Sequence, residues 1–162
     1  QITKINMGVF LTKTKIINDW VDYNGHMNVA YYILIFDQHG SEVLLTNFNM
    51  GEESAKTTKK STMVVESNIA YKQEVKEGDE VDINLIHCDH DKKRILYKLE
   101  MVHSEKKFVA ATYETLSLYV DLGERKVAEF ESEKLKIMND FIEKNRSNFN
   151  SDNLKFYDKL KK

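Results

Sequence analysis

The chain has 162 residues, and 41% of them are apolar, which is enough for one packed core but favours no second domain. Its 24 basic and 26 acidic side chains leave a formal net charge of −2, so neither a nucleic-acid partner nor a membrane surface is indicated. No apolar stretch has the length of a membrane span, and we expect no signal peptide. The single cysteine, Cys88, has no internal disulfide partner, which favours a reducing, cytoplasmic location.

The first part of the chain predicts a strand followed by a long helix. The segment from Val9 to Ile17 alternates in part between apolar and polar residues, as a strand does. Asn28 is a suitable N-cap for a helix that extends to about Asn47, because apolar residues recur there at three- and four-residue spacing. The centre of this helix is nearly free of charge, so we expect it to be mostly buried.

Four more segments have strand character after a polar connector. They are Thr62 to Lys72, Glu80 to His87, Ile95 to His103 and Phe108 to Val120. Short linkers such as Gly78-Asp79 predict hairpin connections, so consecutive strands are expected to pair antiparallel. One curved antiparallel sheet wrapped around a single helix, an α+β fold, is the expected arrangement. Its open edge favours pairing with a second copy, so we expect a homodimer or a dimer of dimers.

The chain changes character at Glu131, where a charged amphipathic helix is predicted. An Asn- and Ser-rich stretch from Asn145 to Asn153 ends this helix, and a last helical piece follows it. We therefore divide the chain into a main domain, residues 1–130, and a C-terminal helical extension, residues 131–162.

The turn from Asp22 to Asn28 before the long helix carries a resemblance to a known family. Together with Val64 to Tyr71 and Gly78 to Val81, it resembles the hotdog-fold acyl-CoA thioesterases of the 4-hydroxybenzoyl-CoA thioesterase type. Within that family, Trp20 to Asn28, Ala110 to Glu114 and Tyr119 to Asp121 are similar to the thioesterases of carnitine degradation, which cleave betainyl-CoA. The match spans about residues 8–120, and it says nothing about the C-terminal extension.

The resemblance implies roles for two residues of this turn. Asp22 falls where these enzymes carry the acid that attacks the thioester carbonyl or activates a water molecule, and Val29 lies near the position whose backbone N–H holds the carbonyl oxygen. A thioester is already electrophilic, so one carboxylate and a helix N-terminus suffice without a metal or an organic cofactor. The structural alternative for Asp22 is a turn-forming residue before Asn24-Gly25.

Each of the other residues of the turn can have a structural role or a role in substrate binding or catalysis. His26 either stabilises the loop, orients Asp22 or contacts the thioester. Asn24 is explained by an Asn-Gly turn and Asn28 by helix capping, although both amides lie close enough in sequence to contact the substrate. Gly25 gives the backbone its freedom and leaves room for the substrate.

Three further sets of residues are candidates for substrate contacts. Asp37, Gln38 and Glu66 either face the dimer cleft as polar partners of the thioester or border the subunit contact. Trp20 and Tyr23 are the better candidates for holding a trimethylammonium group by cation–π attraction, whereas Tyr31 and Tyr71 are expected in the core. Lys93 and Arg94, with Lys92, either meet the phosphates of coenzyme A or form a solvated hairpin tip.

The segment from His87 to Asp91 contains residue types that bind metals, but no second cluster completes a site. We expect Cys88 to be a buried, unreactive thiol. The sequence thus predicts a thioesterase for a small acyl-CoA, with betainyl-CoA as the best single substrate. Two alternatives remain open: a hotdog protein that binds acyl-CoA without cleaving it, and a hotdog dehydratase or hydratase.

Overall fold

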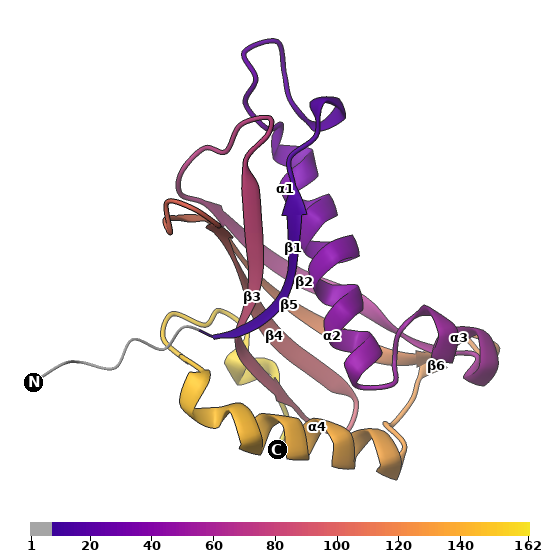
Figure 1. Cartoon of the computed structure of the whole chain (residues 1–162). Helices are drawn as coiled ribbons and strands as arrows, with labels where there is room; N and C mark the ends of the chain where they lie inside the picture. Colours follow the sequence, from indigo (N-terminus) through magenta and orange to yellow (C-terminus); the bar gives the residue numbers. More distant parts are fainter. Residues whose placement is uncertain (1–7) are drawn as a thin grey trace, which may run out of the picture.

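The computed structural model describes residues 8–162, which form one curved antiparallel sheet and the helices around it (Figure 1). The residues before Gly8, which bear on the expected absence of a signal peptide, lie outside this part. The strands are β1 (Val9–Lys15), β2 (Lys60–Tyr71), β3 (Glu80–His90), β4 (Arg94–His103), β5 (Val109–Asp121) and β6 (Lys126–Val127). They lie in the order β1-β3-β4-β5-β2, and β6 pairs with β5. This arrangement confirms the predicted α+β hotdog fold.

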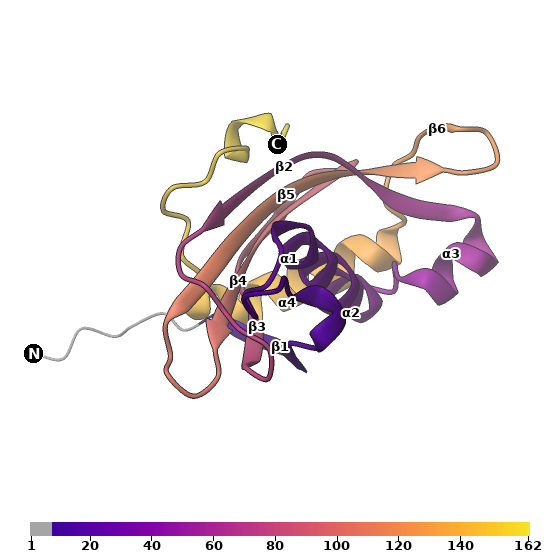
Figure 2. The same ribbon diagram turned by 90° about the horizontal axis from the view of Figure 1, so that it is seen from above.

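The long helix lies in the concave side of the sheet (Figure 2). It consists of α1 (Val29–Ile35), a π-helical segment η2 (Phe36–Ser41) and α2 (Glu42–Asn47), so the predicted bounds are confirmed but the predicted regularity is not. A Cβ atom at Gly40 would lie 2.8 Å from the Leu99 side chain and 2.9 Å from that of Ile83. The helix therefore lies close against the sheet within its irregular segment, and a larger residue at Gly40 would push the two apart.

The predicted hairpin between the second and third strands is wrong. β2 pairs with β5 along its length, whereas β3 pairs with β1 and β4. The linker between β2 and β3 instead runs beside the start of the helix, where the backbone N–H of Met27 donates to the carbonyl of Val75. The predicted antiparallel pairings of β3 with β4 and of β4 with β5 are confirmed. β2 is thus an edge strand.

Two short helices were not expected from the sequence. η1 (Asn18–Trp20) leads from β1 into the turn, and α3 (Glu52–Thr58) occupies the segment that we predicted as a polar connector. Helix α3 buries none of its residues, so it lacks the apolar periodicity on which the sequence interpretation depends.

The C-terminal region contains α4 (Ser132–Asn145), η3 (Arg146–Asn148) and η4 (Tyr157–Lys159). Helix α4 packs against the end of the central helix, where the rings of Phe48 and Phe141 lie 5.1 Å apart. Met138 is fully buried in the main core. The last residues of the chain cross the outer face of the sheet, opposite the central helix (Figure 2). None of the helices within residues 8–162 is long and apolar enough to cross a membrane.

Candidate active site

The turn before the central helix is held in shape by Asp22. Its Oδ1 atom accepts hydrogen bonds from the backbone N–H groups of Asn24 (2.8 Å) and His26 (3.2 Å). Gly25 takes a φ of 79° and a Cβ atom there would meet nothing within 4 Å, so this glycine serves the backbone conformation in an open site. Within residues 8–162, Oδ2 of Asp22 forms no hydrogen bond. One carboxylate oxygen thus fixes the turn and the other is available.

The two sides of the turn are joined by backbone hydrogen bonds. The N–H of Asn28 donates to the carbonyl of Trp20 (3.0 Å), and Val21 forms an isolated β-bridge with Met27. These bonds bring Asp22 and the start of the helix to the same end of the molecule. The linker after β2 adds a second clamp, because the N–H of Glu77 donates to the carbonyl of Gly25 at 3.1 Å. The turn is therefore preorganised by the chain on both sides.

Asn28 is the N-cap of the helix, as predicted. Its side-chain oxygen accepts a hydrogen bond from the N–H of Ala30 (3.0 Å), and its carbonyl accepts one from Tyr31. The N–H of Val29 has no acceptor among the described residues, and the Val29 side chain is exposed. A free N–H at a helix N-terminus can bind a developing oxyanion, and here the helix directly follows the Asp22 turn.

His26 has a partner that sequence analysis missed. Its Nδ1 atom lies 3.5 Å from the carboxylate of Glu74, in the linker after β2. His26 also forms an isolated β-bridge with Lys76. Nothing in the sequence pairs these residues, because they lie about fifty positions apart and the linker was predicted as part of a hairpin. The structural reading of His26, as a residue that stabilises the loop, is supported by these contacts.

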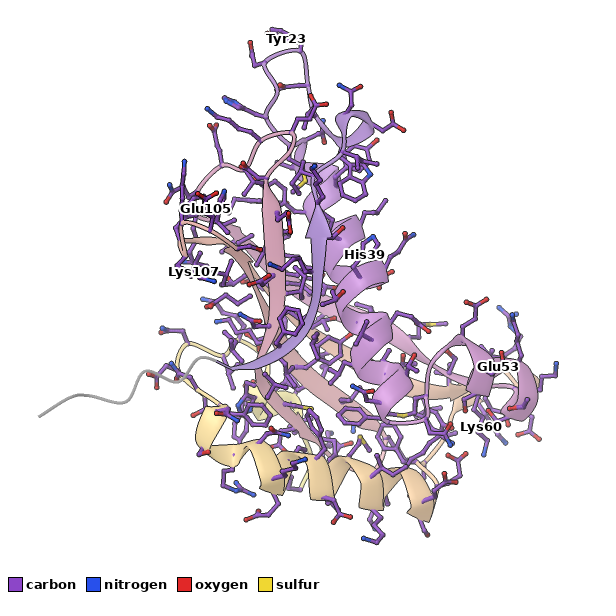
Figure 3. All side chains as sticks on the ribbon, viewed as in Figure 1. Tyr23, His39, Glu53, Lys60, Glu105 and Lys107 are labelled. Carbon is purple, nitrogen blue, oxygen red and sulfur yellow. The ribbon has the colours of Figure 1, made fainter. Side chains whose placement is uncertain are left out.

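Aromatic side chains lie beside the turn on the outer side of the helix. The ring of Trp20 stacks on that of Tyr31, with centroids 6.3 Å apart and an interplanar angle of 23°, and His39 lies 6.2 Å from Trp20. Tyr23 stands at the tip of the turn with 96% of its surface exposed (Figure 3). Tyr31 is half-buried and packs against the core, close to its expected position, whereas Tyr71 is exposed, contrary to expectation, and contacts the buried Tyr32 ring.

Asp37 and Gln38 lie further along the helix, roughly 12 Å from Val29 at 1.5 Å per residue. Both are exposed, and they border a cavity of about 450 Å³ between the helix and the start of β2. The buried Tyr97 hydroxyl donates to Ser41 Oγ (2.7 Å) in the wall of this cavity. In a single chain these residues are therefore separated from the Asp22 turn.

Three other predicted site residues do not meet the turn within one chain. Glu66 lies on the outer face of the sheet, where its carboxylate is 3.5 Å from Lys159 Nζ. Lys93 and Arg94 lie at the β3–β4 hairpin, and their backbone N–H groups donate to Asp91. This hairpin is one β3 length from the turn, and eleven residues of strand extend over roughly 35 Å.

Cys88 is buried in the core, and burial raises the pKa of its thiol. The thiol is therefore protonated and a poor nucleophile, as predicted. Within the described part of the chain, no group of three or more His, Cys, Asp or Glu side chains is placed to hold a metal ion.

Several known proteins resemble this chain in sequence or in fold. The family model of the thioesterase-like superfamily matches residues 17–139. A betainyl-CoA thioesterase of Pseudomonas aeruginosa is 28% identical over 123 residues, which cover 76% of this chain and 77% of that protein. The crystal structure of a putative thioesterase from Pseudomonas putida is 25% identical, with a TM-score of 0.75 and 96% of each chain covered. A Staphylococcus aureus protein in complex with CoA has the same fold, with a TM-score of 0.74, 18% identity and 94% of each chain covered.

The chain therefore belongs to the thioesterase-like superfamily, whose members share this hotdog architecture. More particularly, it is an acyl-CoA thioesterase, the first of the three functions that the sequence suggested.

Proposed function

We propose that the enzyme hydrolyses betainyl-CoA to betaine and coenzyme A. The name of the Pseudomonas aeruginosa relative supports this substrate, and so does the aromatic group at the turn. Trp20, with Tyr31 and His39 beside it, offers a π face to a trimethylammonium group. The exposed ring of Tyr23 is the other candidate for this cation–π contact. A short acyl group keeps this cation within a few bonds of the thioester carbonyl, so both are recognised at the same turn.

Asp22 is the proposed base or nucleophile. As a base, its free Oδ2 accepts a proton from water while the water oxygen bonds to the carbonyl carbon; the C–S bond then breaks and the proton passes to the thiolate of coenzyme A. As a nucleophile, Oδ2 itself bonds to the carbonyl carbon, coenzyme A leaves, and water hydrolyses the resulting anhydride. Both routes need only water as co-reactant, so no cofactor is required.

The backbone N–H of Val29 is the proposed oxyanion donor. Its lack of an acceptor in the described chain and its position at the positive end of the helix dipole support this role. Such a donor contributes roughly 3 kcal/mol to transition-state stabilisation. Asn24 and Gly25 shape the turn, Asn28 caps the helix that carries the donor, and His26 is a positioning residue held by Glu74.

A homodimer is the proposed assembly, because the site is open in one chain and β2 is an edge strand with one free side. Two-fold antiparallel pairing of β2 would place the start of this strand in one copy opposite its end in the other. The end of β2, at Tyr71, lies near the start of the central helix. The Asp22 turn of each copy would therefore face two features of the second copy: the cavity beside Asp37 and the β3–β4 hairpin that carries Lys93 and Arg94. This pairing supports roles for Asp37 and Gln38 at the acyl group and for the hairpin at the phosphates. Glu66, on the outer face, is not part of the proposed site.

We also place the enzyme in the cytoplasm. Its single cysteine, Cys88, is a protonated thiol within the core, and a reducing compartment keeps such a thiol from being oxidised.

The placement of Asp22, with one carboxylate oxygen fixed and one free in the turn that leads into the central helix, is the observation that carries this function. It is tested by thiol release from betainyl-CoA, acetyl-CoA and tert-butylacetyl-CoA, the last being the uncharged analogue of the same shape. Asp22→Asn should lower kcat at least about 100-fold, whereas Asp19→Asn, in the preceding turn of helix, should leave it unchanged. The cationic ester should have the highest kcat/KM in the wild type.

Two results would contradict the proposal. Retained turnover in a folded Asp22→Asn protein would exclude this carboxylate as base and nucleophile. Equal kcat/KM values for the cationic and uncharged esters would exclude cation–π selection and hence betainyl-CoA as the preferred substrate.

A further inference from the structure

The final segment of the chain, residues 150–162, is bound across the outer face of the sheet, and we refer to it as the strap. The N–H of Asn150 donates to the carbonyl of Ile86 on β3 (2.8 Å). The N–H groups of Lys155 and Phe156 both donate to the carboxylate of Glu114 on β5, at distances of 2.7 to 2.9 Å. Further along, the N–H of Lys161 donates to Asp91 (2.8 Å).

The strap lies over a defined set of buried residues on the outer face of the sheet. Glu114 is 1% exposed, and the neighbouring outer-face residues Leu96 and Leu116 are also buried although they are not part of the main core. Cross-strand pairing places Leu96 between Asp89 and Leu116, so these three residues share one row of the sheet. The strap is thus held by buried acceptors and by apolar contacts, and it forms a fixed wall rather than a loose tail.

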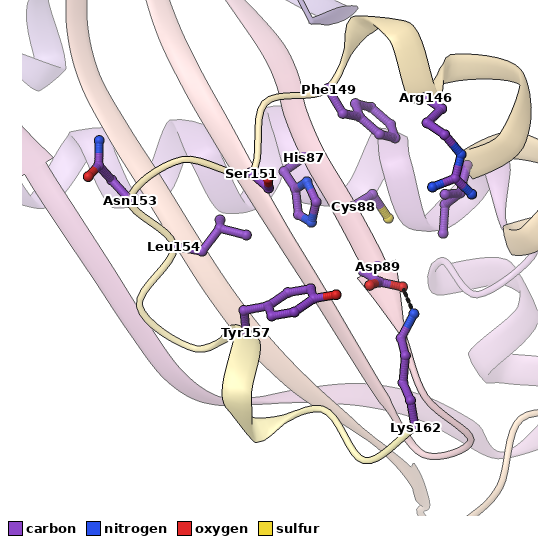
Figure 4. Close-up of a pocket in the computed structure, with 11 residues that line it drawn as sticks. His87, Cys88, Asp89, Arg146, Phe149, Ser151, Asn153, Leu154, Tyr157 and Lys162 are labelled. Carbon is purple, nitrogen blue, oxygen red and sulfur yellow. Dashed lines mark hydrogen bonds and ion pairs between the residues drawn. The ribbon is translucent and has the colours of Figure 1, made fainter.

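A cavity of about 670 Å³ lies between the strap, the end of α4 and this face of the sheet (Figure 4). Its polar lining is rich in hydrogen-bond donors. Six lining side chains carry N–H or O–H groups: His87, Arg146, Ser151, Asn153, Tyr157 and Lys162. Asp89 is the one carboxylate among the lining residues. With a neutral imidazole, the lining side chains carry a net charge of +1, from two cations and one anion.

His87 is the unusual member of this lining. Both of its ring nitrogens are sealed from solvent and have no hydrogen-bond partner in the described structure. The rings of Phe149 and Tyr157 cover it, with centroids 6.0 and 6.4 Å from the imidazole. Burial lowers the pKa of His87, and the nearby Lys162 and Lys98 act in the same direction, against the carboxylates of Asp89 and Glu114. A neutral imidazole has one donor and one acceptor, and here neither is satisfied, which is rare in a folded protein.

The two cations that border the cavity are available for a ligand. Arg146 pairs with Glu143 and Lys162 pairs with Asp89, but the side chains of both cations are more than half exposed. The Arg146–Glu143 pair is exposed on both sides and contributes little to stability, so its exchange for a ligand oxygen costs little. Asp89, in contrast, is only 15% exposed, and Lys162 has to hold both this carboxylate and the ligand.

We infer that this cavity is a binding site for the phosphate group of a small organic molecule. A phosphate offers several acceptor oxygens to a lining with six donors and excess positive charge, and charge-assisted hydrogen bonds of this type are strong. The cavity is much larger than a phosphate ion, and Phe149, Leu154 and Tyr157 provide an apolar wall for an attached organic group. A small turn of the Tyr157 or Phe149 ring brings His87 into contact with the bound anion and satisfies its N–H.

This site is separate from the thioester site. It lies on the convex face of the sheet, whereas the Asp22 turn and the central helix lie on the concave side (Figures 2 and 4). The inference therefore does not depend on the proposed substrate or on the role of Asp22.

Calorimetric titration of the full chain tests the inference with inorganic phosphate, adenosine bisphosphate and acetate as probes. The bisphosphate represents the nucleotide half of coenzyme A. We expect the bisphosphate to bind more tightly than phosphate, and acetate to bind more weakly than either. Lys162→Met and His87→Phe should each weaken phosphate binding at least about tenfold, which corresponds to 1.4 kcal/mol. Lys161→Met is the matched control, because its side chain does not line the cavity.

An NMR titration of the His87 ring gives a second readout that a purely structural role would not change. Bound phosphate should raise the pKa of His87 by about one unit, because an anion nearby favours the charged imidazole. Tighter binding of inorganic phosphate than of the bisphosphate would overturn the organic part of the inference and identify free phosphate as the ligand. Absence of binding by all three probes at millimolar concentration would overturn the inference. Binding that is equal in wild type, Lys162→Met and His87→Phe would overturn it as well, since the ligand would then lie elsewhere.

Discussion

Glu131 is the residue that joins the C-terminal extension to the sheet. Its carboxylate accepts hydrogen bonds from the Tyr119 hydroxyl (2.9 and 3.0 Å) and from Lys60 Nζ (3.2 Å), and it pairs with the buried Lys134 at 3.1 Å. Burial acts to raise the pKa of Glu131, but its own backbone N–H, Tyr119, Lys134 and Lys60 outweigh that effect and lower the pKa to about 2. The ionised form is therefore the one that stabilises the fold.

This pKa predicts how Glu131 contributes to stability as the pH changes. The folded-state pKa lies below the ordinary value of 4.5, so the contribution is complete above about pH 4.5 and is lost as the pH falls toward 2. Glu131→Gln should lower the free energy of unfolding at neutral pH by about 1 to 2 kcal/mol. This is less than the full shift implies, because the carboxylate is 35% exposed and partly screened.

Urea unfolding of both proteins between pH 7 and pH 3 measures the difference. The stabilities of wild type and Glu131→Gln should converge toward the acid end. Glu129→Gln, an exposed neighbour, is the control and should follow the wild type at every pH. A difference that stays constant with pH would show that Glu131 acts through packing and not through its charge.

At this scale the sequence predicts local contacts well and long-range ones poorly. Asn28 caps the helix as predicted, because capping involves only the next two residues. Glu66 was predicted near the substrate, but the register of β2 shifts between Val64 and Glu66. A bulge of one residue exchanges the two faces of a strand, and no signal in the sequence marks this one. The contact of His26 with Glu74 depends in the same way on the path of a distant linker.

At the scale of the elements, the central helix and strands β1 to β5 were predicted from periodicity to within three residues, whereas the two-residue strand β6 was not predicted. The order of the strands in the sheet was not predicted, because we assumed that strands adjacent in sequence pair with each other as hairpins. β2 pairs with β5 since the linker from Lys72 to Asp79 is used to clamp the turn at Gly25 instead of closing a hairpin. The π-helical segment was also not predicted, because close packing of Gly40 on the sheet is a tertiary contact.

Helix α4 contributes to the core through one face, and this predicts a sharp difference between two of its residues. Met138→Ala removes a fully buried side chain and should lower the free energy of unfolding by about 2 to 4 kcal/mol. Lys136→Ala removes an exposed partner of Asp140 and should change it by less than about 0.5 kcal/mol. Chemical denaturation monitored by circular dichroism gives both values. Similar small effects for the two variants would show that α4 is only loosely docked.

At the scale of the whole molecule, the free edge of β2 is the feature that most needs a partner. Met63, Val64 and Val65 are consecutive apolar residues, and each is about half exposed on this edge strand, which pairs with β5 on one side only. Long apolar edges of this kind promote uncontrolled association unless another strand covers them. The same edge borders the Asp37 cavity through Val64, so its pairing and the completion of the active site are expected to depend on each other.

Val65→Lys tests this dependence, because Val65 lies on the edge but does not line the cavity. Two lysines brought together across a two-fold axis repel each other, so the variant should be a monomer by light scattering at micromolar concentration. Its thioesterase activity should fall at least about tenfold, because the lost binding energy shifts the monomer–dimer equilibrium toward the monomer. The activity should rise again at higher protein concentration, because mass action then favours the dimer.

Val127→Lys is the matched control for this experiment. Val127 is exposed to nearly the same extent, 44% against 46% for Val65, but it lies on β6, away from the free edge of β2. This variant should retain both the dimer and its activity. A monomeric Val65→Lys protein with full activity would mean that one chain holds a complete site, and the Asp37 cavity would then have no part in catalysis. A Val65→Lys protein that remains dimeric would place the subunit contact on another surface, and the unpaired β2 edge would require a different explanation.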